Sequence, residues 1–193
     1  MMATGLSFTM FLHILYPAED WKTSRDREYL EIDIIPFHSS FSKKLQLQFS
    51  SLKTLKLISV YLSGCHDQDY LFSNFKNLEK LELINCSGGQ NIFNINCPLL
   101  ASLIITFCSS TCMFVISAPN LKIVRFSELF PVNLNIEKCP ILEKAELFYM
   151  EAFLGVECIS LILSLAKKLS NAKSLTVKMQ FSGVRIGGLD VVH

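Results

Sequence analysis

One nine-residue pattern recurs along this 193-residue chain and limits its fold more than any other feature. The pattern is an apolar residue, two residues, Leu, two residues, an apolar residue, one residue and a last apolar residue. Its six copies are FSSLKTLKL, FKNLEKLEL, CPLLASLII, APNLKIVRF, CPILEKAEL and LSNAKSLTV. The fourth residue of each copy, the lead position, is Leu52, Leu78, Leu100, Leu121, Leu142 or Ala172. Successive lead positions are 26, 22, 21, 21 and 30 residues apart, and three near-equal spacings in a row indicate a true repeat.

The L-x-x-L-x-L core at this spacing is typical of leucine-rich repeats. The last apolar residues of each copy alternate with a period of two, as a short strand requires. One such strand cannot bury its leucines alone, so successive coils stack as parallel strands about 4.8 Å apart. A second alternating stretch precedes four of the strands, and we expect these stretches to be extended on the convex side: LQL from Leu45, FNI from Phe93, FVI from Phe114 and LNI from Leu134.

The longest gap between lead positions holds VECISLILSLAKKL, from Val156 to Leu169, whose length and composition suit a helix. The predicted fold class is therefore α/β: a leucine-rich-repeat solenoid. It combines a curved parallel-strand sheet, a short irregular or extended convex side, and one helix near the C-terminus.

The seven cysteines and four histidines form neither a metal-binding nor a disulfide pattern. There is no C-x-x-C pair, and His66 alone among the histidines adjoins a cysteine, whereas zinc sites show paired ligands at tight spacing. Cys86 and Cys108 stand eight residues after a lead position, and Cys97 and Cys139 stand three residues before one. We expect them to be reduced and to pack as small hydrophobic residues, with no metal and no cofactor.

Composition and charge exclude several classes of protein. Half of the chain is hydrophobic, 18% is charged and the net charge is +1, which argues against disorder and against nucleic-acid binding through a basic face. The apolar run from Leu6 to Tyr16 is shorter than the about 20 residues of a membrane-spanning helix and lacks the basic start of a signal peptide. We predict an intracellular protein, cytoplasmic or nuclear, with no nucleic-acid or membrane partner.

The sequence resembles the plant F-box/LRR family, including members that carry a C-terminal FBD region. The resemblance covers residues 41–179 and is carried by SLKTLKL at Ser51, NCPLLASLII at Asn96, SAPNLKIVRF at Ser117, KCPILEKAEL at Lys138 and LSNAKSLTV at Leu169. Members of that family are adaptors of SCF-type ubiquitin ligases: an N-terminal F-box docks the ligase, and the repeats hold the substrate. The resemblance therefore implies a protein substrate or partner.

The chain departs from that family at both ends. An F-box opens with Leu-Pro, but the prolines of the first 40 residues, Pro17 and Pro36, do not follow a leucine, and the chain stops soon after the last repeat. We expect a truncated architecture that does not bind the ligase adaptor by itself. The predicted division is an N-terminal segment at 1–40 with a cap strand at 29–35, repeats at 41–179 and a tail at 180–193.

The residues between the buried leucines are expected to point to the concave face of the sheet. One row contains Lys56–Glu82 and Arg125–Glu146, which we predict to be charge pairs between adjacent strands. Further aromatic groups are expected near solvent, unless a flanking segment covers them, and aromatics are enriched at interface centres. The candidate partner-binding residues are Lys56, Glu82, Ile104, Phe107, Arg125, Glu146, Phe148 and Tyr149.

The leading hypothesis for function is a non-enzymatic protein-interaction module. It resembles the substrate-recognition region of an F-box adaptor. The alternative is an extracellular leucine-rich-repeat binding or inhibitor domain, but such plant-type repeats run to about 24 residues with Gly-x-Ile-Pro after the strand, a string that does not occur. Gly88-Gly89 lacks the lysine of a phosphate-binding loop and predicts a turn, so no enzymatic site is expected.

Overall fold

The computed structural model describes residues 9–11, 28–33, 51–60, 72, 75–87, 92–108, 113–127, 133–137, 139–151, 156–181, 184–185 and 189–192. Within these ranges the chain forms one helix, α1 (Val156–Lys168), and strands that belong to two sheets. The strands of the larger sheet are β1 (Thr9–Phe11), β2 (Tyr29–Asp33), β3 (Thr54–Ile58), β4 (Lys80–Ile84), β6 (Ser102–Thr106), β8 (Ile123–Ser127), β10 (Lys144–Glu151), β11 (Ser174–Phe181), β12 (Val184–Arg185) and β13 (Leu189–Val192). The smaller sheet contains β5 (Ile92–Asn96), β7 (Met113–Ser117) and β9 (Asn133–Glu137).

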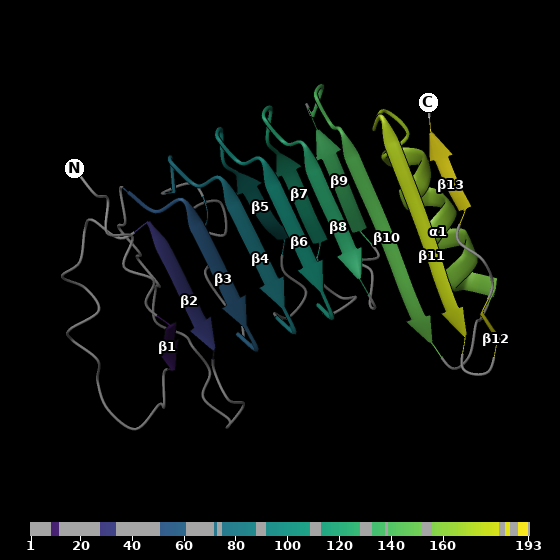
Figure 1. The fold of residues 1–193 in the computed structure, drawn as a ribbon, viewed down its shortest axis with the longest axis horizontal. Helices are drawn as coiled ribbons and strands as arrows, with labels where there is room; N and C mark the ends of the chain where they lie inside the picture. Colours follow the sequence, from purple (N-terminus) through teal and green to yellow (C-terminus); the bar gives the residue numbers. More distant parts are fainter. Residues whose placement is uncertain are drawn as a thin grey trace.

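The larger sheet is a parallel ladder with one strand from each coil (Figure 1). From β1 through β2, β3, β4, β6, β8, β10 and β11, each strand is parallel to the next. The register from β3 to β11 follows the repeat, so that equivalent residues of successive coils face each other in straight rows. β12 and β13 pair with β11 in the antiparallel sense, so the parallel ladder ends at β11.

The apolar positions of the repeat form the core. Every lead position is at most 2% exposed, and β3, β4 and β6 each alternate half-buried and buried side chains. Leu103 of β6, for example, faces Leu81 and Val124 in register, and all three are fully buried. Stacking therefore gives each leucine neighbours in the coils on both sides, as the repeat predicts.

The predicted extended stretches on the convex side form the smaller parallel sheet, which lies behind the larger one (Figure 1). Phe93 and Phe114 are buried there, with ring centroids 5.5 Å apart. The prediction is confirmed for β5, β7 and β9, whereas LQL at Leu45 lies outside the described residues. Coils of 21 to 22 residues are too short for a helix on this side, and a second strand fills it instead.

The helix α1 occupies the long last gap between repeats, as predicted. Ile162, Leu165 and Leu169 recur at helical spacing and are buried, so one stripe of the helix belongs to the core. Lys167 and Lys168 in the last turn interact favourably with the negative end of the helix dipole. Figure 1 shows α1 behind β11, on the same side of the larger sheet as the smaller sheet.

The Cys-Pro-x-Leu and Ala-Pro-x-Leu motifs are tight turns that lead into the strands. The amide of Leu100 donates to the carbonyl of Cys97 at 3.2 Å, and the amide of Leu121 donates to the carbonyl of Ala118 at 3.0 Å. Proline suits the second position of such a turn because its φ is already near the required value. The motif therefore combines a buried first residue, an exposed proline and a buried lead leucine.

The segment expected to act as a cap strand forms β2. Its residues pair in parallel with β3, from Tyr29 opposite Thr54 to Asp33 opposite Ile58. The amides of Lys53 and Thr54 both donate to the carbonyl of Glu28, and the amides of Glu79 and Lys80 use the carbonyl of Lys53 in the same way one coil later. β2 therefore stacks on β3 with the same backbone hydrogen bonds that join the next two coils of the repeat.

Candidate partner-binding face

The candidate site is the side of the larger sheet that faces away from α1 and the smaller sheet, which we call the open face (Figure 1). The register arranges its residues in three rows across β3, β4, β6, β8, β10 and β11. The first row is Thr54, Lys80, Ser102, Ile123, Lys144 and Ser174; the second is Lys56, Glu82, Ile104, Arg125, Glu146 and Thr176; the third is Ile58, Ile84, Thr106, Ser127, Phe148 and Lys178. All of these side chains are half-buried or exposed, whereas the residues that alternate with them are predominantly core residues.

The second row is the row that the sequence pattern predicts, and the structure brings its residues side by side as expected. Phe148 lies on the same face, in the third row, and is half-buried. Sequence reasoning missed the rest of the first and third rows, including Ile84 and Ile123. The period-two alternation of the strands was the signal that could have found them.

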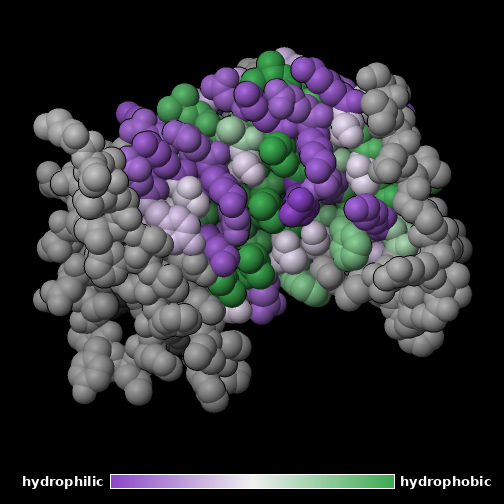
Figure 2. Space-filling model, in the orientation of Figure 1, coloured by the Kyte–Doolittle hydropathy of each residue, from purple (hydrophilic) through white to green (hydrophobic). Residues whose placement is uncertain are grey.

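An apolar strip crosses the middle of the open face between hydrophilic residues (Figure 2). In the register, Ile84 of β4, Ile104 of β6 and Ile123 of β8 lie on one diagonal of the three rows. Diagonal neighbours on one face of a sheet are within reach of each other's side chains. Ile123 is 39% exposed, which is high for an isoleucine at the centre of a sheet.

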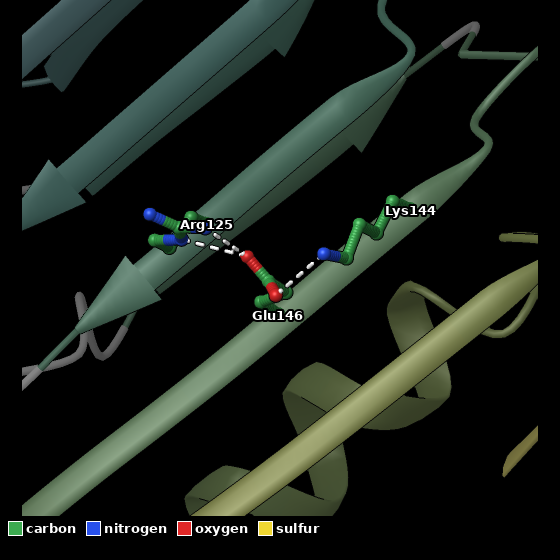
Figure 3. Close-up of polar contacts among 3 residues, drawn as sticks. All are labelled: Arg125, Lys144 and Glu146. Carbon is green, nitrogen blue, oxygen red and sulfur yellow. Dashed lines mark hydrogen bonds and ion pairs between the residues drawn. The ribbon is translucent and has the colours of Figure 1, made fainter. Parts of the chain in front are cut away.

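On β10, the strand that pairs with β8, a carboxylate has two cationic partners (Figure 3). Glu146 accepts a hydrogen bond from Arg125 Nε at its Oε2, at 2.7 Å, and its Oε1 lies 2.8 Å from Lys144 Nζ. Partial burial raises the pKa of Glu146, but the hydrogen bonds and charges of Lys144 and Arg125 outweigh it, so the pKa lies below its ordinary value. The predicted Arg125–Glu146 pair between adjacent strands is confirmed.

The second predicted charge pair has a different arrangement. Lys56 and Glu82 face each other across β3 and β4 in register, but Glu82 also pairs within its own strand, where its Oε1 lies 2.6 Å from Lys80 Nζ. Glu82 and Glu146, the carboxylates of these three rows, are each paired with the lysine two residues earlier in the same strand. Such partly exposed pairs contribute less than about 1 kcal/mol each and mainly shape the surface charge.

Directly after β3, β4 and β6, one residue in each coil has a left-handed backbone conformation. Ser59, Asn85 and Phe107 have φ values of 54°, 52° and 54°, at the same position of successive coils. Their amides donate to the next coil, to the carbonyls of Ile84, Thr106 and Ser127. The conformation therefore belongs to the repeat, where it extends the hydrogen-bond ladder past the end of each strand.

Ser59, Asn85 and Phe107 differ in how well their side chains tolerate a positive φ. Asn enters the left-handed region readily, and Asn85 Nδ2 also donates to Ser59 Oγ at 3.1 Å. A bulky residue in this region is a real outlier, and Phe107 is one, with 45% of its surface exposed.

The prediction that Tyr149 lies near solvent is wrong. Tyr149 is 5% exposed and belongs to the core, although it stands at the same repeat position as Phe107. The reason is that β10 continues to Glu151, paired with β11 along its whole length, so that the alternation of a strand turns Tyr149 inward.

The described thiols are core groups. Cys86, Cys97, Cys108 and Cys139 are buried thiols that take no part in disulfide bonds. The Cys97 thiol donates to the carbonyl of Phe72 at 3.3 Å, and burial raises its pKa to about 12. A hydrogen bond with Cys108 lowers the pKa of Cys86 in spite of its burial. The side chains of these four cysteines therefore lie in the stacked core, as the repeat pattern predicts.

The described part of the chain has neither a cluster of metal ligands nor a membrane-spanning helix. No three His, Cys, Asp or Glu side chains gather there as ligands of a metal ion would. No helix within the same residues has the length and apolar character needed to cross a bilayer.

Comparison with known proteins identifies the repeat. A family model described as "At1g61320/AtMIF1, LRR domain" matches residues 24–183. That range begins ahead of β2, so it includes the strand that sequence reasoning placed in a separate N-terminal segment. No curated protein and no solved structure matches the chain significantly. Domains of leucine-rich repeats are generally protein-binding modules without enzymatic activity. The family match, which covers most of the chain, and the stacked coils agree: this protein belongs to the At1g61320/AtMIF1 family of leucine-rich-repeat domains.

Proposed function

We propose that this protein is a non-enzymatic interaction module that binds another protein on the open face. The observation that carries the proposal is the composition of this face: an apolar strip of Ile84, Ile104 and Ile123 lies between the ion-paired charges of Glu82 and Glu146. An apolar centre with a polar surround is the usual anatomy of a protein interface. The elements that cover the sheet, α1 and the smaller sheet, lie on its other side (Figure 1).

A finer form of the proposal is that the open face holds the substrate of an SCF-type ubiquitin ligase. Its support is the resemblance of the Cys-Pro-x-Leu and Ala-Pro-Asn-Leu turns to those of F-box/LRR adaptors. A location in the cytoplasm or nucleus is part of this proposal, and its support is that Cys86, Cys97, Cys108 and Cys139 are thiols rather than disulfides. No specific observation favours the extracellular alternative.

The test compares partners captured by the wild-type protein with those captured by two variants. Ile104→Asp puts a charge at the centre of the apolar strip, on a half-buried position that remains hydrated. Leu163→Asp puts the same charge on α1, at a side chain that is 65% exposed and lies away from the open face. Partners that bind wild type and Leu163→Asp but not Ile104→Asp support the proposal. Partners that Ile104→Asp retains contradict it.

The ligase hypothesis has its own measurement. Purified ligase adaptor is tested for direct binding to this polypeptide, and we expect none, because in the F-box/LRR family this contact belongs to the F-box. A captured partner that becomes ubiquitinated only when an F-box is fused to the chain would support the finer proposal. Direct adaptor binding by the polypeptide alone would contradict our expectation.

A further inference from the structure

We propose that the solenoid opens first at the contact between β4 and β6. The turn before β6 carries Leu99 at the position where the turns before β8 and β11 carry an asparagine that clamps two coils together. The opening separates β4 from β6 and does not depend on a partner bound to the open face.

The clamps are formed by the third residue of the turn motif, directly before the lead position. Asn120 Nδ2 donates to the carbonyl of Pro98 at 2.8 Å, and Asn171 Nδ2 donates to the carbonyl of Cys139 at 2.9 Å. Each bond joins a turn to the turn of the preceding coil. One such hydrogen bond favours the closed contact by roughly twofold to tenfold.

Two coils carry an aliphatic residue at the clamp position instead. Leu99 has no hydrogen-bond donor in its side chain, and it is 44% exposed, so its hydrophobic contact is also incomplete. Ile141 stands at the same position before β10, but ion pairs join that coil to its neighbour. These pairs are Arg125–Glu146 and Lys122–Glu143.

An ion pair cannot replace the clamp at β6, because residues 83–121 contain no Asp, Glu, Lys, Arg or His. The side-chain bonds described from the coil of β6 to the preceding coil are donated by thiols. Cys97 Sγ donates to the carbonyl of Phe72 at 3.3 Å, and Cys108 Sγ donates to the carbonyl of Leu83 at 3.6 Å. Thiols are weak donors, so this contact depends mainly on the backbone ladder and on apolar packing.

The contacts on either side of it have stronger side-chain bonds. Asn85 Nδ2 donates to Ser59 Oγ between the coils of β3 and β4, and Asn120 clamps the coils of β6 and β8. In a stack of coils each coil contacts its neighbours, so a partial opening begins where the contact between neighbours is weakest. The chain therefore divides into two cooperative units, one that ends with β4 and one that begins with β6.

Two matched pairs of amides report on neighbouring contacts. The amides of Ala101 and Ser102 donate to the carbonyl of Glu79 across β4 and β6, and those of Lys122 and Ile123 donate to the carbonyl of Ala101 across β6 and β8. Hydrogen exchange of the full chain under native conditions, followed by NMR and corrected for intrinsic rates, measures the opening at each contact. We expect the first pair to be protected about threefold to tenfold less than the second. Equal protection of the two pairs, or weaker protection of the second, would overturn the inference.

Leu99→Asn supplies the missing donor. Its acceptor is the carbonyl of Lys76, which stands where Pro98 stands in the next turn. We expect this variant to slow the exchange of Ala101 and Ser102 by about threefold or more and to leave the pair across β6 and β8 unchanged. Leu99→Ala is the matched control, because it removes the aliphatic group without adding a donor, and it should not slow the exchange.

Asn120→Leu makes the reverse change at the contact of β6 and β8. It should speed the exchange of Lys122 and Ile123 to about the level of the wild-type pair across β4 and β6. No change in this variant, or equal slowing by Leu99→Ala and Leu99→Asn, would show that the asparagine does not hold the coils together. Protection that rises evenly from β2 to β8, without a step at β6, would indicate fraying from the end of the sheet and would also overturn the inference.

Discussion

Two adjacent substitutions in β6, Leu103→Asp and Ile104→Asp, should have very different effects on stability. Leu103 is completely buried between Leu81 and Val124, so its replacement removes the packing of a core leucine, about 2–5 kcal/mol. The new carboxyl group must also be neutral to remain buried. Protonating a group of pKa about 3.9 at pH 7 costs about 4 kcal/mol. The sum, about 6–9 kcal/mol, is comparable with the whole stability of a typical domain.

The second substitution changes a half-buried residue on the open face. Ile104 stands between Glu82 and Arg125 in the register, and an aspartate there keeps its hydration and lies beside a guanidinium group. The loss is limited to part of the burial of one isoleucine and some strand propensity, about 1–2 kcal/mol.

Urea unfolding followed by far-ultraviolet circular dichroism distinguishes the two variants. We expect Leu103→Asp to lack a cooperative transition and Ile104→Asp to keep one, with its midpoint lowered by about 0.5–1 M. Equal damage from both substitutions, or greater damage from Ile104→Asp, would refute the register on which the open face is built.

Three further predictions follow from the core, the charges and the backbone. Without denaturant, an alkylating reagent should leave the thiols of Cys86, Cys97, Cys108 and Cys139 largely unmodified, because they are buried. A stoichiometric zinc ion, or a disulfide between any two of these cysteines, would contradict their place in the core. Glu146→Gln should reduce stability at pH 7 by up to about 1 kcal/mol, because the folded state lowers the pKa of this carboxyl group and the ionised form is the stabilising one. That difference should vanish as pH falls below the ordinary value of 4.5 and through the lowered folded-state pKa, and a difference that grows with acid in urea titrations would reverse the sign of the linkage. Phe107→Gly should be more stable than Phe107→Ala by about 1 kcal/mol in thermal unfolding, because glycine tolerates a positive φ; at an extended position alanine would be the more stable of the two.

The repeat pattern alone determined most of the architecture. A fixed set of apolar positions at spacings of 21 to 22 residues can be buried only if the coils stack, and stacking aligns equivalent residues. The buried lead positions, the second row of the open face, the extended strands of the convex side and the helix in the longest gap all follow from this condition. Arg125 and Glu146 could be paired from the sequence because their strands are neighbours in the same register.

The tertiary structure decided which side chains are buried where the local sequence pattern is the same. Phe107 and Tyr149 stand at one repeat position and are both aromatic, yet one is exposed and the other buried. The difference lies in the partner strands: β10 pairs with β11 over eight residues, which holds Tyr149 in an extended backbone, whereas β6 ends at Thr106 and the chain turns left-handed at Phe107. How far a strand continues depends on the length of its neighbour in another coil. That non-local pairing determines which of the two aromatic side chains is exposed.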